Sequence, residues 1–156
     1  MKKKINFFFS PFYFYFAIMK FWLIKSEPFK YSWTQFLKDQ RTFWDGVRNY
    51  QARNNLQSMS VGDKCLFYHS NEGKEVVGIA EVVNPAYQDP TTKETAWVVV
   101  DVKPVESLKH PVSLIKMKTD PRLSKMGLLR QPRLSVIALT EDEYNIILQL
   151  SNDTSI

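Results

Sequence analysis

The sequence is poor in the residues that most often bind metals or form covalent intermediates. It has one cysteine, Cys65, and two histidines, His69 and His110. A single cysteine excludes an intramolecular disulfide, and these three side chains are too few for a structural zinc site. Cys65 lies in the apolar run Cys-Leu-Phe-Tyr, which favours a buried hydrophobic role over a nucleophilic one. We therefore predict neither a metal nor a cofactor.

Glycine is also scarce, with 5 residues in 156, and the glycine-rich phosphate loops are missing. Neither G-x-G-x-x-G nor G-x-x-x-x-G-K-[ST] occurs, so dinucleotide and P-loop chemistry lack their phosphate cradles. His69 and Ser70 are neighbours on an expected strand and point to opposite faces, which argues against a nucleophile–base pair. No catalytic residue is predicted, and the acid–base groups left for an enzyme are Glu27, Asp45 and His69.

Strong charge of one sign is absent over most of the chain. The formal net charge is +5, from 21 Lys and Arg against 16 Asp and Glu. Residues 1–18 hold three of the lysines and no acid, so residues 19–156 have a net charge of only +2. Such a mildly basic domain lacks the surface of a tight duplex binder, and any affinity for nucleic acid must come from a pocket.

Residues 1–18 differ in composition from the rest of the chain. Three lysines precede an aromatic, apolar stretch, an arrangement that resembles a secretory signal peptide. Pro11 interrupts the stretch, however, and the small-x-small cleavage site of a signal peptide does not follow. The stretch is shorter than the roughly 20 apolar residues of a membrane span. We interpret 1–18 as an N-terminal extension outside a single domain at 19–150, with a membrane tether as the alternative. Residues 151–156 are expected to be a frayed tail.

The remaining pattern predicts an α+β domain. Helices are expected after the capping residues Ser32, Asn49 and Thr140, the last within a Thr-Glu-Asp-Glu capping box. Apolar runs predict strands at Phe21–Ile24, Lys64–His69, Val76–Val83, Ala96–Val102 and Arg133–Leu139. Without regular β-α-β alternation, a small, mainly antiparallel barrel or curved sheet with flanking helices is favoured over a doubly wound sheet.

Two further features concern the strands. Gly78 is expected to mark a bulge or a close approach, because it has no side chain. Pro104 is expected to end the strand that begins at Ala96, since proline cannot donate to a ladder. Residues 84–94, which are polar and contain two prolines, are expected to form a loop.

Aromatic and polar side chains are concentrated in the stretches 22–33 and 44–54. Tryptophans at 22, 33 and 44 stand beside Lys, Ser, Asn and Arg. Aromatic faces combined with amide and guanidinium donors suit a flat, polar ligand such as a base. The alternative is that the tryptophans pack in the core and the polar residues cap helices.

The motifs of this chain, taken in order, closely resemble the EVE domain family over about residues 19–150. They are W-L-I-K-S-E-P (22–28), Y-S-W (31–33), W-D-G-V-R-N-Y-Q-A-R-N (44–54), M-S-V-G-D (59–63), F-Y-H-S (67–70), G-I-A-E-V (78–82), A-Y-x-D (86–89) and P-R-L-S-V (132–136). The resemblance implies a PUA-like fold, a small, curved, mainly antiparallel β-barrel with flanking helices. The architecture is similar to that of YTH domains, which read a methylated base in an aromatic cage.

The resemblance also implies a function, that of a non-catalytic nucleic-acid-binding module reading a modified or flipped base. Carried over by position, its pocket is expected to comprise Trp22, Lys25, Ser26, Trp33, Trp44, Gly46, Val47, Arg48, Asn49, Tyr68, His69 and Ser70. The nucleic-acid backbone is expected to contact Lys25, Arg48, Arg53, Arg130 and Arg133. A base held between indoles would gain about 1–3 kcal/mol from stacking.

Two other functions remain open from the residues alone. One is an enzyme acting on modified nucleotides, and the other is a binder of a small anionic metabolite through Lys25, Arg48 and nearby loop amides. The expected partner is nucleic acid with a modified base, in DNA or RNA. The chain is expected to be a monomer of the cytoplasm, or of the nucleus in a eukaryote.

Overall fold

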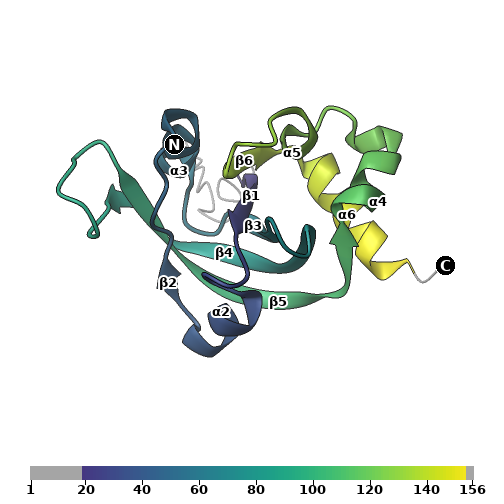
Figure 1. Cartoon of the computed structure of the whole chain (residues 1–156), viewed down its shortest axis with the longest axis horizontal. Coiled ribbons are helices and arrows are strands. Elements are labelled where there is room, and N and C mark those ends of the chain that lie inside the picture. Colours follow the sequence, from purple (N-terminus) through teal and green to yellow (C-terminus); the bar gives the residue numbers. More distant parts are fainter. Residues whose placement is uncertain (1–18, 154–156) are drawn as a thin grey trace, which may run out of the picture.

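A mixed six-stranded sheet forms the centre of the computed structural model, which describes residues 19–153 (Figure 1). The predicted extension 1–18 lies outside the described residues. The strand order is β2-β5-β4-β3-β1-β6, and only β1 and β3 pair in parallel. The strands are β1 (Phe21–Ser26), β2 (Thr42–Phe43), β3 (Lys64–His69), β4 (Glu75–Gln88), β5 (Val98–Ser113) and β6 (Val136–Leu139). The α+β class with a mainly antiparallel sheet is confirmed. The order leaves β2 and β6 at the edges, so closure into a barrel stays a prediction.

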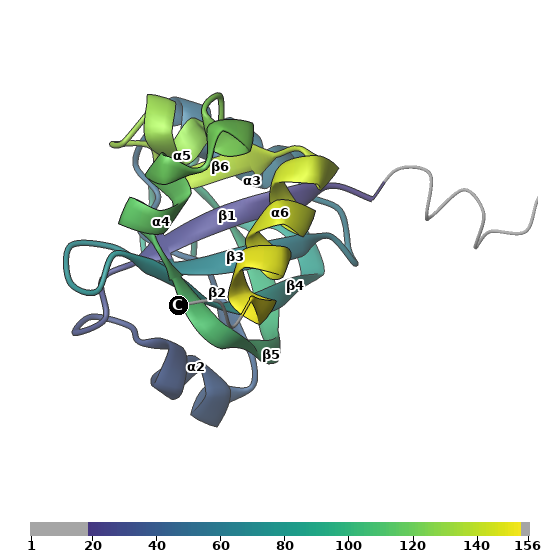
Figure 2. The ribbon, with the colours of Figure 1, turned by 90° about the vertical axis from the view of Figure 1, so that its right-hand side faces the viewer.

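Helices surround this sheet on several sides. In Figure 1, α2 lies at the lower edge, while α4, α5 and α6 gather at the right. In Figure 2, α6 passes in front of β3 and β4, and it contacts β5. The helices are α2 (Trp33–Asp39), α3 (Tyr50–Ser58), α4 (Leu114–Thr119), the 3-10 helix η1 (Pro121–Leu123), α5 (Gly127–Arg130) and α6 (Glu141–Asn152). None of these helices is long and apolar enough to cross a membrane.

The predicted caps begin the helices as expected. Ser32 Oγ accepts from Gln35 N at 3.0 Å and starts α2, and Asn49 Oδ1 accepts from Ala52 N at 2.9 Å and starts α3. Thr140 forms both hydrogen bonds of the capping box that starts α6. Each side chain satisfies a backbone N–H that has no partner within its helix, which is why these starts can be read from sequence.

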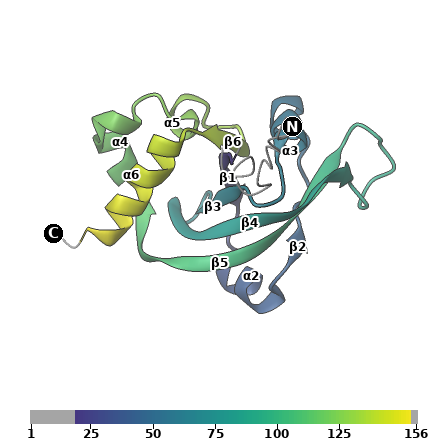
Figure 3. The ribbon, with the colours of Figure 1, turned by 180° about the vertical axis from the view of Figure 1, so that it is seen from behind.

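The paired strands β4 and β5 are much longer than predicted. The expected loop at 84–94 is wrong for residues 84–88, since β4 reaches Gln88, and it is confirmed for residues 89–94. The expected strand end at Pro104 is wrong, since β5 passes through Pro104 to Ser113. Register shifts at several points in this pair interrupt the regular hydrogen-bond ladder. Such bulges are where proline is tolerated within a sheet, because no N–H is needed there. Seen from behind, the two strands form a bent, two-stranded antiparallel ribbon (Figure 3).

Ser151 and Asn152, which were expected to belong to a frayed tail, are part of a helix. Helix α6 continues through Asn152, and Ser151 is buried. The Ser151 hydroxyl accepts from His110 N at 3.1 Å and donates to His110 O at 2.8 Å. This pair of bonds fastens the last turn of α6 to β5, because a hydroxyl can both donate and accept.

Gly78 of β4 makes the close approach that the sequence indicated. A Cβ added at Gly78 would overlap the indole of Trp33, which is itself buried.

We expect Gly78→Ala to lower the free energy of unfolding by about 2 kcal/mol, as overpacking of a core does. Urea denaturation followed by circular dichroism measures this. Gly73→Ala is expected to lower the free energy of unfolding less, because the added Cβ would lie at ordinary contact distances. The φ of 81° at Gly73 is nevertheless unfavourable for alanine. Unchanged stability of Gly78→Ala would show that the Trp33 indole moves freely.

Candidate functional site

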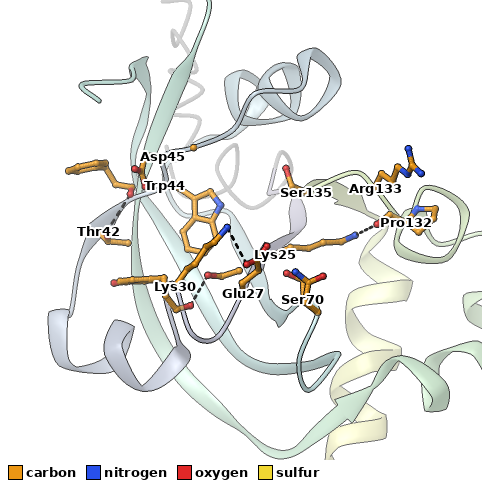
Figure 4. Close-up of a pocket in the computed structure, with 15 residues that line it drawn as sticks. Lys25, Glu27, Lys30, Thr42, Trp44, Asp45, Ser70, Pro132, Arg133 and Ser135 are labelled. Atoms are coloured by element: carbon orange, nitrogen blue, oxygen red, sulfur yellow. Dashed lines mark hydrogen bonds and ion pairs between the residues drawn. The ribbon is translucent and has the colours of Figure 1, made fainter. Parts of the chain in front are cut away.

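An open cavity of about 640 Å³ lies at the carboxyl end of β1 (Figure 4). Four chain segments that are distant in sequence line it. They are the end of β1 with the turn after it, β2 with the loop after it, the β3–β4 turn, and the segment before β6. The lining residues are Lys25, Ser26, Glu27, Lys30, Tyr31, Thr42, Phe43, Trp44, Asp45, Gly46, Ser70, Asn71, Pro132, Arg133 and Ser135.

Hydrogen bonds from the end of β1 hold three of these segments together. Ser26 O accepts from Ser70 N at 2.9 Å, and Lys25 N donates to Ser135 O at 3.1 Å. The Lys25 ammonium donates to Pro132 O at 2.8 Å, on the right in Figure 4, and burial lowers the pKa of this ammonium. Two of the loop segments that line the cavity are therefore tied to the end of β1, which fixes their positions.

Trp44 forms an aromatic wall of the cavity. Its backbone N–H donates to Val100 O at 2.8 Å, which ties it to β5. Its ring packs edge-on against Phe67 and Tyr31, with centroids 5.5 and 6.4 Å apart. The indole N–H has no acceptor within residues 19–153, and no buried side-chain nitrogen or oxygen there lacks a partner. That N–H therefore reaches solvent, and Figure 4 shows the ring nitrogen on the cavity side.

The other tryptophans donate their indole N–H groups to the protein. Trp22 donates to Asp63 at 2.9 Å, Trp33 to Ser107 at 2.8 Å and Trp97 to Glu94 at 2.7 Å. Trp22 and Trp33 are buried and line no part of the cavity. The expected slot between the indoles of Trp22, Trp33 and Trp44 is therefore wrong. Buried indoles need a hydrogen-bond acceptor, and these two find theirs inside the fold.

The structure brings together only part of the predicted pocket. Lys25, Ser26, Trp44, Gly46 and Ser70 line the cavity, with Gly46 at a φ of 79° in the loop after β2. The remaining predicted lining residues have places elsewhere: Trp22, Trp33, Val47, Arg48, Asn49, Tyr68 and His69.

Several of these remaining residues have structural tasks. Val47 is buried in the core, and Asn49 uses its side chain to cap α3. His69 Nε2 accepts the backbone N–H of Trp33 at 3.1 Å, and burial lowers the pKa of its imidazole. Tyr68 is almost fully buried and faces a smaller cavity of about 210 Å³. A single sequence does not separate such tasks from ligand binding, because the same residue types serve both.

The cations predicted to contact a nucleic-acid backbone are also divided. Lys25 and Arg133 line the cavity, and Arg133 is exposed with no hydrogen bond or ion pair in the described part of the chain. Arg48 instead pairs with Asp89 at 2.9 Å. Arg53 donates to Ala96 O at 3.1 Å, and Arg130 donates to Ser124 O at 2.9 Å.

Asp89 fixes the Arg48 guanidinium in place. Burial alone would raise the pKa of the Asp89 carboxyl, but hydrogen bonds from Thr91 and Arg48 outweigh it and lower that pKa. The guanidinium lies 5.7 Å from the Trp97 ring centroid, and Trp97 lies 5.0 Å from the Tyr50 ring. The Arg53 guanidinium lies over the Tyr50 ring, also at 5.0 Å from the ring centroid.

Sequence reasoning missed several cavity residues, among them Lys30, Phe43, Asn71 and Ser135. Lys30 pairs with Glu27 at 3.2 Å, which partly neutralises the rim. Lys30 could have been predicted from its position, because it lies between two of the motifs that match the family pattern, at 22–28 and 31–33. Nothing in the sequence places Ser135 next to Lys25, because that contact depends on the β1–β6 pairing.

Within residues 19–153, no three His, Cys, Asp or Glu side chains gather to hold a metal ion. The cavity offers other chemistry. Two lysines and an arginine favour an anion, one indole favours a flat ring, and Ser26, Ser70 and Asn71 supply small polar groups. Of the acid–base candidates, Glu27 and Asp45 line the cavity and His69 does not.

Comparisons with known proteins agree with the motif pattern. Thymocyte nuclear protein 1 from Rattus norvegicus is 36% identical over 167 residues, covering 85% of this chain and 74% of that protein. A crystal structure of a protein from Agrobacterium tumefaciens superposes with a TM-score of 0.84, with 44% identity and coverage of 88% of this chain and 96% of that chain.

A human relative has been crystallised with nucleic acid. The structure of human THYN1 protein in complex with 5-methylcytosine-containing DNA matches with a TM-score of 0.80 and 33% identity, covering 87% of this chain and 99% of that chain. The profile of the EVE domain matches residues 20–150 of this sequence. Together with the ordered motifs, this match shows that the chain belongs to the EVE domain family.

Proposed function

We propose that the cavity at the end of β1 binds a single modified base of a nucleic acid, turned out of its stack. A flipped base needs a ring to stack on, polar groups along its edge and cations for the flanking phosphates. Trp44 provides the ring, Ser26, Ser70 and Asn71 provide small polar groups, and Lys25, Lys30 and Arg133 provide positive charge.

The observation that carries this proposal is the indole N–H of Trp44. It is the one tryptophan N–H within residues 19–153 that no protein acceptor occupies. Because this N–H lies in the plane of the ring, a base that stacks on the indole face leaves the N–H free to donate to a phosphate oxygen of the same nucleotide. One indole wall, in place of the expected cage of three, indicates stacking on one face with the other face towards the basic rim.

The human relative supports the ligand class. Its crystal structure contains DNA with 5-methylcytosine, and it shares the fold over 87% of this chain. The small net charge of residues 19–156 also favours binding through a pocket over binding through a charged face. An enzyme is less well supported, since Glu27 is already paired with Lys30.

A direct test compares labelled oligonucleotides that differ only in one central base. Fluorescence anisotropy would measure the dissociation constants for cytosine, 5-methylcytosine and other common modified bases in DNA and RNA. We expect at least one modified base to bind about tenfold more tightly than its parent, which is the discrimination that one methyl-sized group gives in a fitted pocket.

Two results would contradict the proposal. Equal affinity for every modified and unmodified oligonucleotide would show that the protein does not distinguish modified bases. Displacement of the oligonucleotide by inorganic phosphate or a simple carboxylate at similar concentration would instead favour a small-anion binder. Lys118→Gln, on α4 and outside the cavity, serves as a control for general charge effects.

A further inference from the structure

A second, smaller cavity of about 280 Å³ adjoins the first, and the two share Pro132 and Arg133. It lies between the start of α3 and the segment before β6. Its other lining residues are Asn49, Gln51, Gln131 and Leu134. Because Arg133 borders both cavities, a ligand too long for the first cavity that extends past Arg133 reaches the second cavity.

The polar side chains of the second cavity have few tasks in the fold. Gln51 and Gln131 are exposed, and neither side-chain amide has a hydrogen bond within the described residues. By contrast, the Asn49 side chain is used as the cap of α3. Leu134 is buried and gives the cavity an apolar floor. Two amides above an apolar floor match a base, whose face is apolar and whose edge both donates and accepts.

We propose that this second cavity is a subsite for the nucleotide next to the modified base. Arg133 contacts the phosphate that joins the two nucleotides, and Gln51 and Gln131 recognise the edge of the neighbouring base. The inference rests on the proposed function and adds a preference for sequence context. A glutamine amide pairs with adenine through two hydrogen bonds, so adenine is the base expected to bind best there.

A third cavity borders the first on the side of Lys74, and it is a poorer candidate. It holds about 210 Å³ and is lined by Tyr68, Leu114 and Leu128 as well as by Lys74. Asn71 is its one side-chain amide. Lys74 nevertheless offers a matched comparison, because it is an exposed cation beside a cavity that also adjoins the first.

The experiment uses oligonucleotides that contain one preferred modified base and are shortened one nucleotide at a time from either end. For the unaltered chain, we expect affinity to fall about tenfold when the nucleotide on one particular side is removed. Arg133→Gln and the pair Gln51→Ala with Gln131→Ala should each reduce this loss to less than about twofold. The affinity of the Gln51→Ala and Gln131→Ala pair for the isolated modified nucleoside should stay unchanged, because neither glutamine lines the first cavity.

Matched controls and opposite outcomes are available in the same chain. Gln57→Ala, an exposed glutamine of α3 outside the three cavities, and Lys74→Gln should leave the length dependence as it was. The subsite is disproved if the loss persists in Arg133→Gln, or if Lys74→Gln removes it instead. If affinity depends on oligonucleotide length but not on the modified base, the proposed function is overturned and the subsite is kept. If the unaltered chain binds no oligonucleotide, both are overturned.

Discussion

Trp44→Ala is expected to weaken binding of a modified oligonucleotide by about 100-fold. Loss of base stacking accounts for roughly 1–3 kcal/mol, and loss of the indole donor adds about 1 kcal/mol. The N–H of Trp44 has no acceptor within residues 19–153, so it is available to a ligand. Anisotropy of a labelled oligonucleotide is the suitable measurement, because it does not depend on tryptophan fluorescence.

Two phenylalanine variants separate stacking from hydrogen bonding. Trp44→Phe keeps an aromatic ring beside Phe67 and removes only the donor, so a loss of about fivefold is expected. Trp97→Phe removes an indole that is bonded to Glu94 outside the cavity, and its affinity should not change. Equal losses for Trp44→Phe and Trp97→Phe would remove Trp44 from the site. Thermal unfolding must accompany these measurements, since Trp44 is only 7% exposed and also supports the core.

Asp63→Ala is expected to lower the free energy of unfolding by about 4 kcal/mol, the largest stability effect of any change considered. Asp63 is 2% exposed and accepts three hydrogen bonds. Its donors are the Trp22 indole at 2.9 Å, Ser60 N at 2.9 Å and Lys20 N at 3.2 Å. Each donor left unpaired inside the fold costs about 1–3 kcal/mol. Chemical denaturation gives the value directly.

Two further aspartate variants give this prediction its scale. Asp63→Asn keeps one acceptor oxygen and should lose about half as much stability. Asp142→Ala removes an exposed carboxylate from the first turn of α6, where about 0.3–1 kcal/mol is expected. If Asp63→Ala were no more destabilising than Asp142→Ala, the three hydrogen bonds would have little net value.

Local signals in the sequence carried well into the structure. The caps Ser32, Asn49 and Thr140 each start a helix, because a cap needs only residues three positions apart. Gly78 marks a close approach, as its lack of a side chain indicated. The prolines misled the strand prediction, since whether a strand tolerates Pro104 depends on the register of its neighbour.

The candidate site was only partly predictable, and the tryptophans show why. Trp22, Trp33 and Trp44 look alike in sequence, each beside polar residues. Their roles differ because Asp63, Ser107 and the cavity lie opposite their respective ring nitrogens, at sequence separations of 41 and 74 residues for the two buried pairs. An acceptor that far away cannot be assigned from one chain without its fold.

The sequence by itself determined the family, the α+β class, the helix starts and the concentration of aromatic and polar residues near the end of β1. These properties depend on residue type and on short spacing. Tertiary structure alone decided which indole keeps an unoccupied N–H, and it brought Pro132 and Arg133 beside Lys25. The physical reason is that a cavity is the space left between segments once the sheet has paired, and that pairing joins residues about 110 positions apart.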